Sequence, residues 1–248
     1  MVLALSGALL GGCASLPAGQ VYDPAEKVNR VSYSFNSVVD RLILSPLSKG
    51  YVAVTPKQGR ILVSNFFDNS RYIGTVLNDF LQAKGKQGVA DLGRFLINST
   101  LGVAGLFDPA TPMGLEKHQE DFGQTLAVWG APAGAYMVLP ILGPDTVRNT
   151  PDLAVSTLTD GLFYAGFFVA SSVMIPLSIL STVDLRSRAS DAIRFVNESA
   201  LDPYVFTREA WMQHRNYLIY DGHPPEPVYP DFEDDLPDDE GTIRKSDR

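Results

Sequence analysis

The sequence lacks most of the motifs that enzymes use. Its 248 residues include one cysteine and three histidines, and no HExxH, paired CxxC or EF-hand pattern supplies metal ligands. No GxSxG turn raises a serine nucleophile, and no GxxxxGK[ST] or GxGxxG loop could cradle a nucleotide phosphate. We therefore expect a protein that is not an enzyme, that needs no metal or cofactor, and that does not hydrolyse ATP.

The few candidate catalytic groups have simpler interpretations. His118 lies in the polar stretch EKHQED, which favours a surface or hydrogen-bonding histidine over a catalyst, and the same holds for His214. Glu120 and Asp121 are adjacent, and neighbouring side chains on a loop rarely converge as an acid and base pair. We expect these two carboxylates to cap a helix or to face solvent.

Charge is concentrated at one end of the chain. The formal net charge is −8, and residues 226–248 hold nine acids against three bases, so the remainder is close to neutral. The stretch 223–248 combines proline with like charges and few apolar residues, which predicts an acidic disordered tail. Aromatic residues without basic patches do not form a stacking platform, so we expect no nucleic acid partner.

The N-terminal residues have the pattern of a bacterial lipoprotein signal. A short apolar run ends in Leu10, Gly11 and Gly12, directly before the single cysteine, Cys13. This pattern predicts a signal peptide over 1–12, diacylglyceryl attachment at Cys13, and an acylated linker over 13–22. No base precedes the run, so we expect the true start to lie upstream. Ala14 is not the aspartate that retains lipoproteins in the inner membrane, which favours the outer membrane.

Helical periodicity dominates the rest of the chain and predicts one mainly α domain over 23–222. Apolar spacing and start signals predict helices over 24–43 facing a core, from Pro56 to Phe80 with a break near Asn69, and around Val89 to Leu96. Further helices are expected over 183–196 and from Pro203 to about Tyr220. Between them, 102–143 is rich in glycine and proline, which predicts tightly packed turns.

A run of twenty residues without charge, 161–180, is long enough to span a bilayer as a helix. A lipoprotein bound for the outer membrane must leave the inner one, and Pro176 would kink a helix, so we do not expect a span. A buried core helix is the alternative. We favour a helix, or two joined near Ser172 to Pro176, lying within one leaflet. Its expected lipid-facing residues are Phe163, Phe167, Phe168, Val169, Met174, Ile175 and Leu177.

Seven motifs in order resemble a known family. The segments are DPAEKVNRVSYSFN, SNFFDN, NDFLQ, RFLINSTLGVAGLFD, EDFGQTLAVWG, YMVLPILGPDTVR and DPYVFTREAWMQHR. They are similar to the ordered signatures of the MlaA (VacJ) family of outer-membrane lipoproteins, and they cover Asp23 to about Asp221. The resemblance implies a doughnut-like helical domain in the inner leaflet of the outer membrane, on its periplasmic side, with a central amphipathic channel.

The resemblance also implies a function and partners. Such a protein removes phospholipids mislocalised to the outer leaflet and passes them to the periplasmic lipid carrier MlaC, which maintains lipid asymmetry. Trimeric porins hold it in place. Two alternatives remain open, a scaffolding lipoprotein that binds porins without carrying lipid, and a phospholipid-degrading enzyme.

The family's channel-lining hairpin suggests channel or gating residues here, with turns that merely pack as the alternative. These residues are Gly130, Gly134, Tyr136, Leu139, Pro140 and Gly143. Asp145 and Arg148, which flank the apolar run, are candidates to contact headgroups, although a local salt bridge or cap explains them equally well. Asn65 and Asn98 lie inside apolar runs, and we expect them to satisfy buried backbone groups.

Overall fold

The computed structural model describes residues 23–225. The predicted signal peptide 1–12, the lipidation site Cys13, the linker 13–22 and tail residues 226–248 lie outside the described residues. One compact unit, Val21–Pro224, contains the helices and strands described below.

The unit is mainly helical. Its helices are α1 (Glu26–Val39), a π-helical segment η1 (Asp40–Leu44), α2 (Ser45–Val54), α3 (Lys57–Leu81), α4 (Gly85–Thr100), α5 (Phe122–Val128), α6 (Asp152–Thr159), α7 (Gly161–Ala165), α8 (Ser171–Arg188), α9 (Ser190–Ser199) and α10 (Pro203–Ile219). Strands β1 (Tyr136–Leu139) and β2 (Gly143–Thr146) form an antiparallel hairpin in which Leu139 pairs with Gly143. The hairpin lies against α1 and α10.

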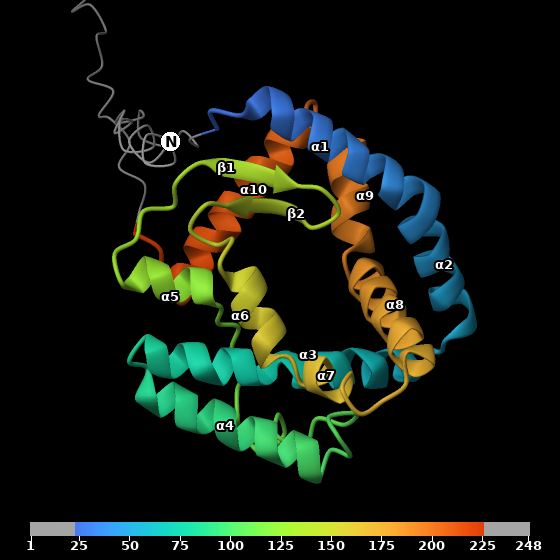
Figure 1. Ribbon diagram of the computed structural model, residues 1–248, viewed down its shortest axis with the longest axis vertical. Coiled ribbons are helices and arrows are strands. Elements are labelled where there is room, and N and C mark those ends of the chain that lie inside the picture. The colour runs from blue at the N-terminus through green and yellow to red at the C-terminus, as the bar shows by residue number, and fades with distance from the viewer. Residues whose placement is uncertain (1–22, 226–248) are drawn as a thin grey trace, which may run out of the picture. The chain divides into compact units, whose positions relative to one another are not determined.

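The elements of this unit follow one another around a ring (Figure 1). Helices α1, η1 and α2 form one continuous rod that bends around the ring from α1 to α2, and α2 packs against α8. Helix α8 contacts α3, which in turn contacts α5 and α6, and α10 connects α5 back towards α9 and the hairpin. Helix α4 packs along α3 on the outside of the ring. The expected doughnut-like helical domain is therefore confirmed.

Polar side chains hold the joints of the ring. Arg30 of α1 binds Asp202 at the start of α10 at 2.8 Å. Thr125 of α5 donates to Asn78 of α3 at 2.7 Å. Tyr51 of α2 and Ser64 of α3 both donate to Asp184 of α8, and Arg215 of α10 pairs with Asp121 of α5. Each of these side chains has a hydrogen-bond partner or an opposite charge, as polar groups at a packed joint between helices require.

Most of the predicted helices are present, but several details differ. Helix α3 runs unbroken through Asn69, so the predicted break there is wrong. Within this helix, the amide nitrogen of Asn69 donates to the hydroxyl of Ser99 on the neighbouring α4 at 2.9 Å. Asp202 caps α10 as predicted, because its carboxylate accepts from the backbone nitrogens of Tyr204 and Val205.

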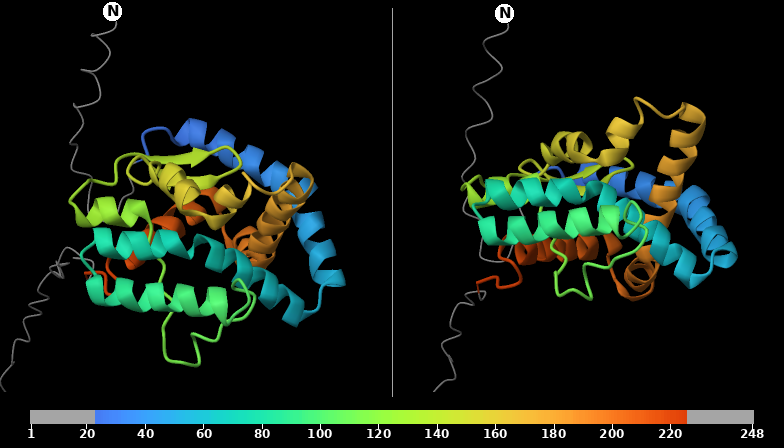
Figure 2. Two further views of the ribbon diagram at one scale, coloured as in Figure 1. Left: turned by 60° about the horizontal axis from the view of Figure 1, so that its bottom comes forward. Right: turned by 90° about the horizontal axis from the view of Figure 1, so that it is seen from below.

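The charge-free run is divided between two helices. The helix is interrupted between α7 and α8, not near Ser172 to Pro176 as predicted, because Pro176 lies inside α8. Within residues 23–225, none of the helices combines the length and apolarity needed to cross a bilayer, which confirms the prediction against a span there. The segment joining α7 to α8 projects from one side of the unit (Figure 2, right).

Candidate functional site

The α7–α8 segment exposes most of its predicted lipid-facing side chains. Phe168 is 90% exposed, and Phe167 is 70% exposed. Phe163, Val169 and Ile175 are also exposed, while Met174 and Leu177 are half-buried. The ring of Phe163 packs edge-on against both Tyr164 and Phe167, which holds the aromatic group together at the surface. Five of the seven predicted residues are thus exposed apolar side chains, and contacts between aromatic rings join Phe163 to Phe167 among them.

The rod formed by α1, η1 and α2 is exposed in the same way. We expected the apolar stripe of the helix over 24–43 to face a core, and this is wrong. Phe35 is 49% exposed, and Val31 and Leu42 are 70% and 67% exposed. The residue of α1 that is buried is polar, Asn29. Helical periodicity indicates that one face is apolar, but it cannot indicate whether protein or lipid covers that face.

The interior of the described unit is correspondingly polar. Within residues 23–225, eight hydrophobic side chains are buried, against seventeen polar or charged ones, while forty large hydrophobic side chains are exposed. A buried hydrophobic cluster joins Tyr136 and Val138 of β1 to Tyr204 of α10. Large exposed apolar patches are rare on proteins that contact only water. This distribution therefore calls for an apolar partner.

The predicted channel and gating residues lie in the hairpin and in the loop that leads from α5 into it. Gly130, Gly134 and Gly143 all have positive φ angles, of 90°, 70° and 93°. At Gly143 no atom lies within 4 Å of where a Cβ would stand, so glycine is needed there for its backbone conformation. Pro140 is exposed at the tip, and Leu139 is half-buried. All the predicted channel residues except Tyr136 are therefore at least partly accessible to a ligand. They are Gly130, Gly134, Leu139, Pro140 and Gly143.

Two asparagines of α1 hold the hairpin, and sequence reasoning missed their role. The side chain of Asn29 donates to the Tyr136 carbonyl at 3.1 Å and accepts from the Val138 nitrogen at 2.9 Å. Asn36 does the same with the Leu139 carbonyl and the Ile141 nitrogen, at 2.9 and 2.7 Å. Their spacing of seven residues, which places both on one helix face, is the signal that could have revealed them.

The tip of the hairpin is strained. Ile141 has φ of 70°, a left-handed conformation that a β-branched residue rarely adopts, and it is 72% exposed. The hydrogen bond from its nitrogen to Asn36 helps to maintain this conformation. Strain of this kind costs about 1–3 kcal/mol and is commonly found at sites of function.

Of the three other candidates, Tyr136 and Asp145 are buried and Arg148 is half-buried. Tyr136 is 1% exposed, and its hydroxyl, which has no partner within the described chain, lies in the core instead of lining an open path. Asp145 is also buried, which raises its pKa, and it accepts from the Thr146 nitrogen. Arg148 donates to the Ala131 carbonyl at 3.2 Å. For Asp145 and Arg148 this placement favours the local structural role over headgroup contact.

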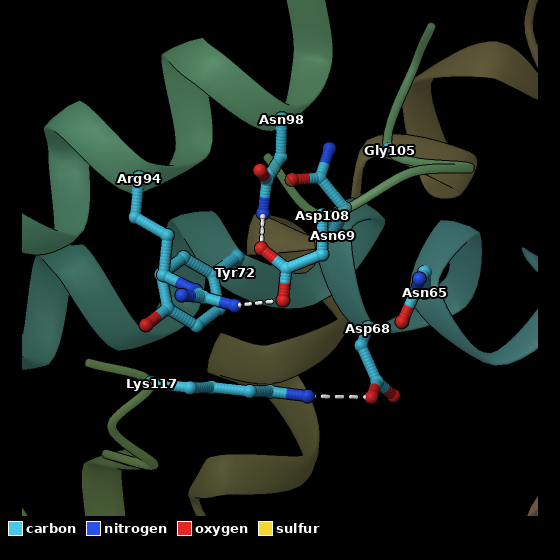
Figure 3. A pocket seen from close by; sticks show the side chains of 9 residues that line it. All are labelled: Asn65, Asp68, Asn69, Tyr72, Arg94, Asn98, Gly105, Asp108 and Lys117. Atoms are coloured by element: carbon cyan, nitrogen blue, oxygen red, sulfur yellow. Dashed lines mark hydrogen bonds and ion pairs between the residues drawn. The ribbon is translucent and has the colours of Figure 1, made fainter. Parts of the chain in front are cut away.

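A second polar site lies between α3, α4 and the loop that follows α4 (Figure 3). Arg94 binds Asp108 at 2.5 Å, Asn98 also donates to Asp108, and Lys117 binds Asp68 at 2.6 Å. The cavity is about 20 Å³, which is enough for a single water molecule. The site therefore holds a loop in place and is too small for an organic ligand.

The remaining sequence predictions concern single side chains. Asn65 donates to the Leu106 carbonyl and Asn98 accepts from the Ala110 nitrogen, so both satisfy backbone groups as predicted. His118 binds the buried Asp91 at 2.9 Å, and Asp121 caps α5. No cluster of three or more metal-ligating side chains occurs within the described part of the chain.

The fold and the surface define a ring-like helical protein with polar joints and an apolar exterior, the reverse of the usual distribution. The sequence model of the family described as MlaA lipoprotein matches residues 21–218. The chain belongs to this family.

Relatives and a solved structure agree with this assignment. The chain is 33% identical over 230 residues to the intermembrane phospholipid transport system lipoprotein MlaA of Escherichia coli strain K12, covering 89% of this chain and 88% of that protein. It is 35% identical over 201 residues to an uncharacterized protein of Rickettsia typhi, covering 81% and 79%. A solved structure described as the structural basis for maintenance of bacterial outer membrane lipid asymmetry aligns with a TM-score of 0.69 at 29% identity, covering 79% of this chain and 98% of that chain.

Proposed function

We propose that this protein is an outer-membrane lipoprotein that removes mislocalised phospholipids from the outer leaflet. Lipid passes through an amphipathic channel within the ring and is handed to a periplasmic carrier of the MlaC type. The protein lies on the periplasmic side, in the inner leaflet, anchored by acylation at Cys13 and held by trimeric porins. The chain is correspondingly divided into a signal peptide (1–12), an acylated linker (13–22), a helical domain (23–222) and an acidic tail (223–248).

The exposed apolar surface is the observation that carries this proposal. Side chains such as Phe168 and Val31 are 90% and 70% exposed, while polar groups occupy the interior. In water, each such side chain would lose the roughly 1.5–3 kcal/mol that burial provides. In a leaflet the same surface is solvated by acyl chains, and no spanning helix is needed within residues 23–225.

A channel also avoids the free-energy cost of exposing a phospholipid to water. A phospholipid with about thirty methylenes exposes apolar surface costing on the order of 25 kcal/mol, at about 0.8 kcal/mol per methylene. A sheltered path is therefore required for useful transfer rates. The headgroup needs polar partners at the same time, and a ring that combines apolar and polar groups supplies both. The Escherichia coli relative is named as a lipoprotein of an intermembrane phospholipid transport system, which supports this proposal.

We assign gating of the path to the hairpin. Its tip is strained at Ile141 and is attached to α1 through Asn36, and backbone strain of this kind is found at ligand clamps and switch regions. A disulfide engineered between β1 and α1 should stop lipid passage and leave folding intact. Transport at the normal rate by the oxidised protein would contradict this assignment, and reduction of the same sample provides the control.

Two measurements test the function as a whole. In a deletion strain we expect more phospholipid exposed on the cell surface, and restoration by the wild-type gene. Native mass spectrometry of the purified protein should find bound phospholipid. An unchanged outer leaflet together with lipid-free protein would favour a scaffold that binds porins, and hydrolysis products after incubation with phospholipid would favour an enzyme.

A further inference from the structure

One stretch of the chain has bases and no acids. Residues 41–67 contain Arg41, Lys49, Lys57 and Arg60 and no aspartate or glutamate, although the whole chain has a net charge of −8. The stretch covers η1, α2 and the first part of α3. The net charge of the whole chain therefore hides a local surplus of positive charge, and the expectation of no basic patch is wrong for this stretch.

These four bases lack the compensation that other arginines have. Arg186, Arg208 and Arg215, for example, all form ion pairs. Within residues 23–225, no carboxylate lies within 4.0 Å of the nitrogens of the four bases. Three of them are exposed, and the half-buried Arg60 has an Nε atom without a hydrogen-bond partner in this part of the chain.

Exposed aliphatic side chains alternate with the bases. Val54 is 81% exposed, Leu42 is 67% exposed, and Leu47 and Ile61 are each 48% exposed. Helix α2 turns its small and polar side toward α8, since Ser48 is buried and Tyr51 donates to Asp184 there. Its other side lies at the edge of the ring (Figure 1). Aliphatic groups beside long cationic side chains are typical of segments at a membrane interface, where the charged ends reach the headgroups.

We propose that this basic surface, residues 41–61 of η1, α2 and the start of α3, binds the headgroups of anionic phospholipids in the leaflet that holds the ring. Charge complementarity selects the lipid phosphates, and the neighbouring aliphatic side chains enter the acyl region below them. The contact would set the depth and tilt of the ring at α2. It rests on the proposed function only in placing the protein at a membrane.

Lipid selectivity of the reconstituted full-length chain tests this inference. Spin-labelled phosphatidylglycerol and phosphatidylcholine are measured separately in phosphatidylcholine vesicles, and the ratio of their association with the protein is the readout. Because each base near a headgroup contributes about 1 kcal/mol, we expect the wild type to prefer phosphatidylglycerol about fivefold or more. The variant Lys49→Gln/Lys57→Gln/Arg60→Gln should lose this preference, and higher salt should weaken it in the wild type.

Two further variants keep the test decisive. Lys49→Gln/Lys57→Gln leaves the half-buried Arg60 in place and should lose most of the preference. Lys27→Gln/Lys86→Gln removes the same charge from exposed bases that also lack ion pairs, and should keep it. Equal association of both lipids with the wild type, or an equal loss in the control variant, would overturn the proposal.

The source of the phosphate and the link to transport are separated by two more readouts. Inorganic phosphate at constant ionic strength should leave the lipid preference unchanged, and competition by it would overturn the assignment to lipid. Purified protein without bound phospholipid would count against the proposed transport function alone, because headgroup selectivity is measured on the lipid surrounding the ring.

Discussion

Asn29 and Asn36 show how single residues determine the position of the hairpin. Each amide side chain pairs with both a carbonyl and a nitrogen of the hairpin backbone, as a neighbouring strand would. Asn29 also donates to Asp23 at 2.8 Å, so its hydrogen-bonding groups are satisfied although it is only 3% exposed. A helix thereby substitutes for a third strand at the free edge of β1.

Replacing Asn29 should therefore destabilise the fold more than replacing Asn36. Asn29→Ala leaves a buried carbonyl and a buried nitrogen without partners, and we expect it to lower the free energy of unfolding by about 2–4 kcal/mol. Denaturant unfolding in detergent measures this change. Asn197→Ala, at an exposed position of α9, is the matched control and should have little effect. Equal losses of stability in Asn29→Ala and Asn197→Ala would contradict the structural role of Asn29.

Asp79 is the second residue with a distinctive environment. It is fully buried, and burial together with the neighbouring carboxylate of Asp91 raises its pKa to about 8. The native state therefore keeps a proton that the unfolded chain releases near pH 4. Between about pH 4 and 8 the native state binds more protons than the unfolded state, so stability falls as pH rises through this window.

The variant Asp79→Asn should flatten this dependence. Its amide can donate to Asp91 as the protonated carboxyl does, and no proton is then lost on unfolding. We expect the slope contributed by Asp79, up to about 1.4 kcal/mol per pH unit, to disappear from unfolding curves recorded between pH 5 and 8. Identical slopes in the variant and the wild type would show that Asp79 is ionised in the native state.

At the scale of elements, the sequence predicted helices more reliably than their surroundings. The start of α10 was predictable because Asp202 and Pro203 form a local capping signal. The outward face of α1 was not, because Val31 and Phe35 follow the same spacing in a core helix and in a lipid-facing one. The clamp by Asn29 and the burial of Tyr136 depend on contacts more than a hundred residues apart, which no local pattern encodes.

Segment η1 is the element with the clearest geometric effect. It inserts a π-helical stretch into the rod between α1 and α2, and its Asp40 pairs with Arg186 of α8. Deleting Ile43 would turn α2 by about 100° relative to α1, because one residue of an α-helix corresponds to that rotation. Tyr51 would then no longer face Asp184.

We expect this deletion to separate α2 from α8 while both helices persist. The circular dichroism of the variant should stay close to that of the wild type, and proteolysis between α2 and α3 should become faster. Ile43→Ala keeps the residue count and is the control. Wild-type protease resistance in the deletion variant would show that the rod absorbs the lost residue without rotating α2.

For the whole molecule, the prediction concerns the exposed aromatic group. Phe168→Asp places a charge where the side chain is 90% exposed, so the fold in detergent should be unaffected. In a leaflet the same change removes the roughly 1.5–3 kcal/mol gained by burying phenylalanine and adds the cost of a charge. We expect association of the domain with vesicles to fall at least about tenfold.

The control for this variant adds the same charge elsewhere. Gln213→Asp lies on an exposed polar position of α10 and should leave vesicle association within about twofold. A loss of stability in detergent for Phe168→Asp would instead indicate that Phe168 is covered by protein.

The polar joints of the ring have a thermodynamic consequence. Only eight hydrophobic side chains are buried within residues 23–225, and the elements are held by groups such as Arg30, Asp184 and Arg215. Since the heat capacity change of unfolding comes mainly from newly hydrated apolar surface, calorimetry in detergent should give well below the usual 12–15 cal/mol/K per residue, or about half of it. The free energy of unfolding should then vary little with temperature. Added salt, which screens the ion pairs at the joints, should lower the melting temperature.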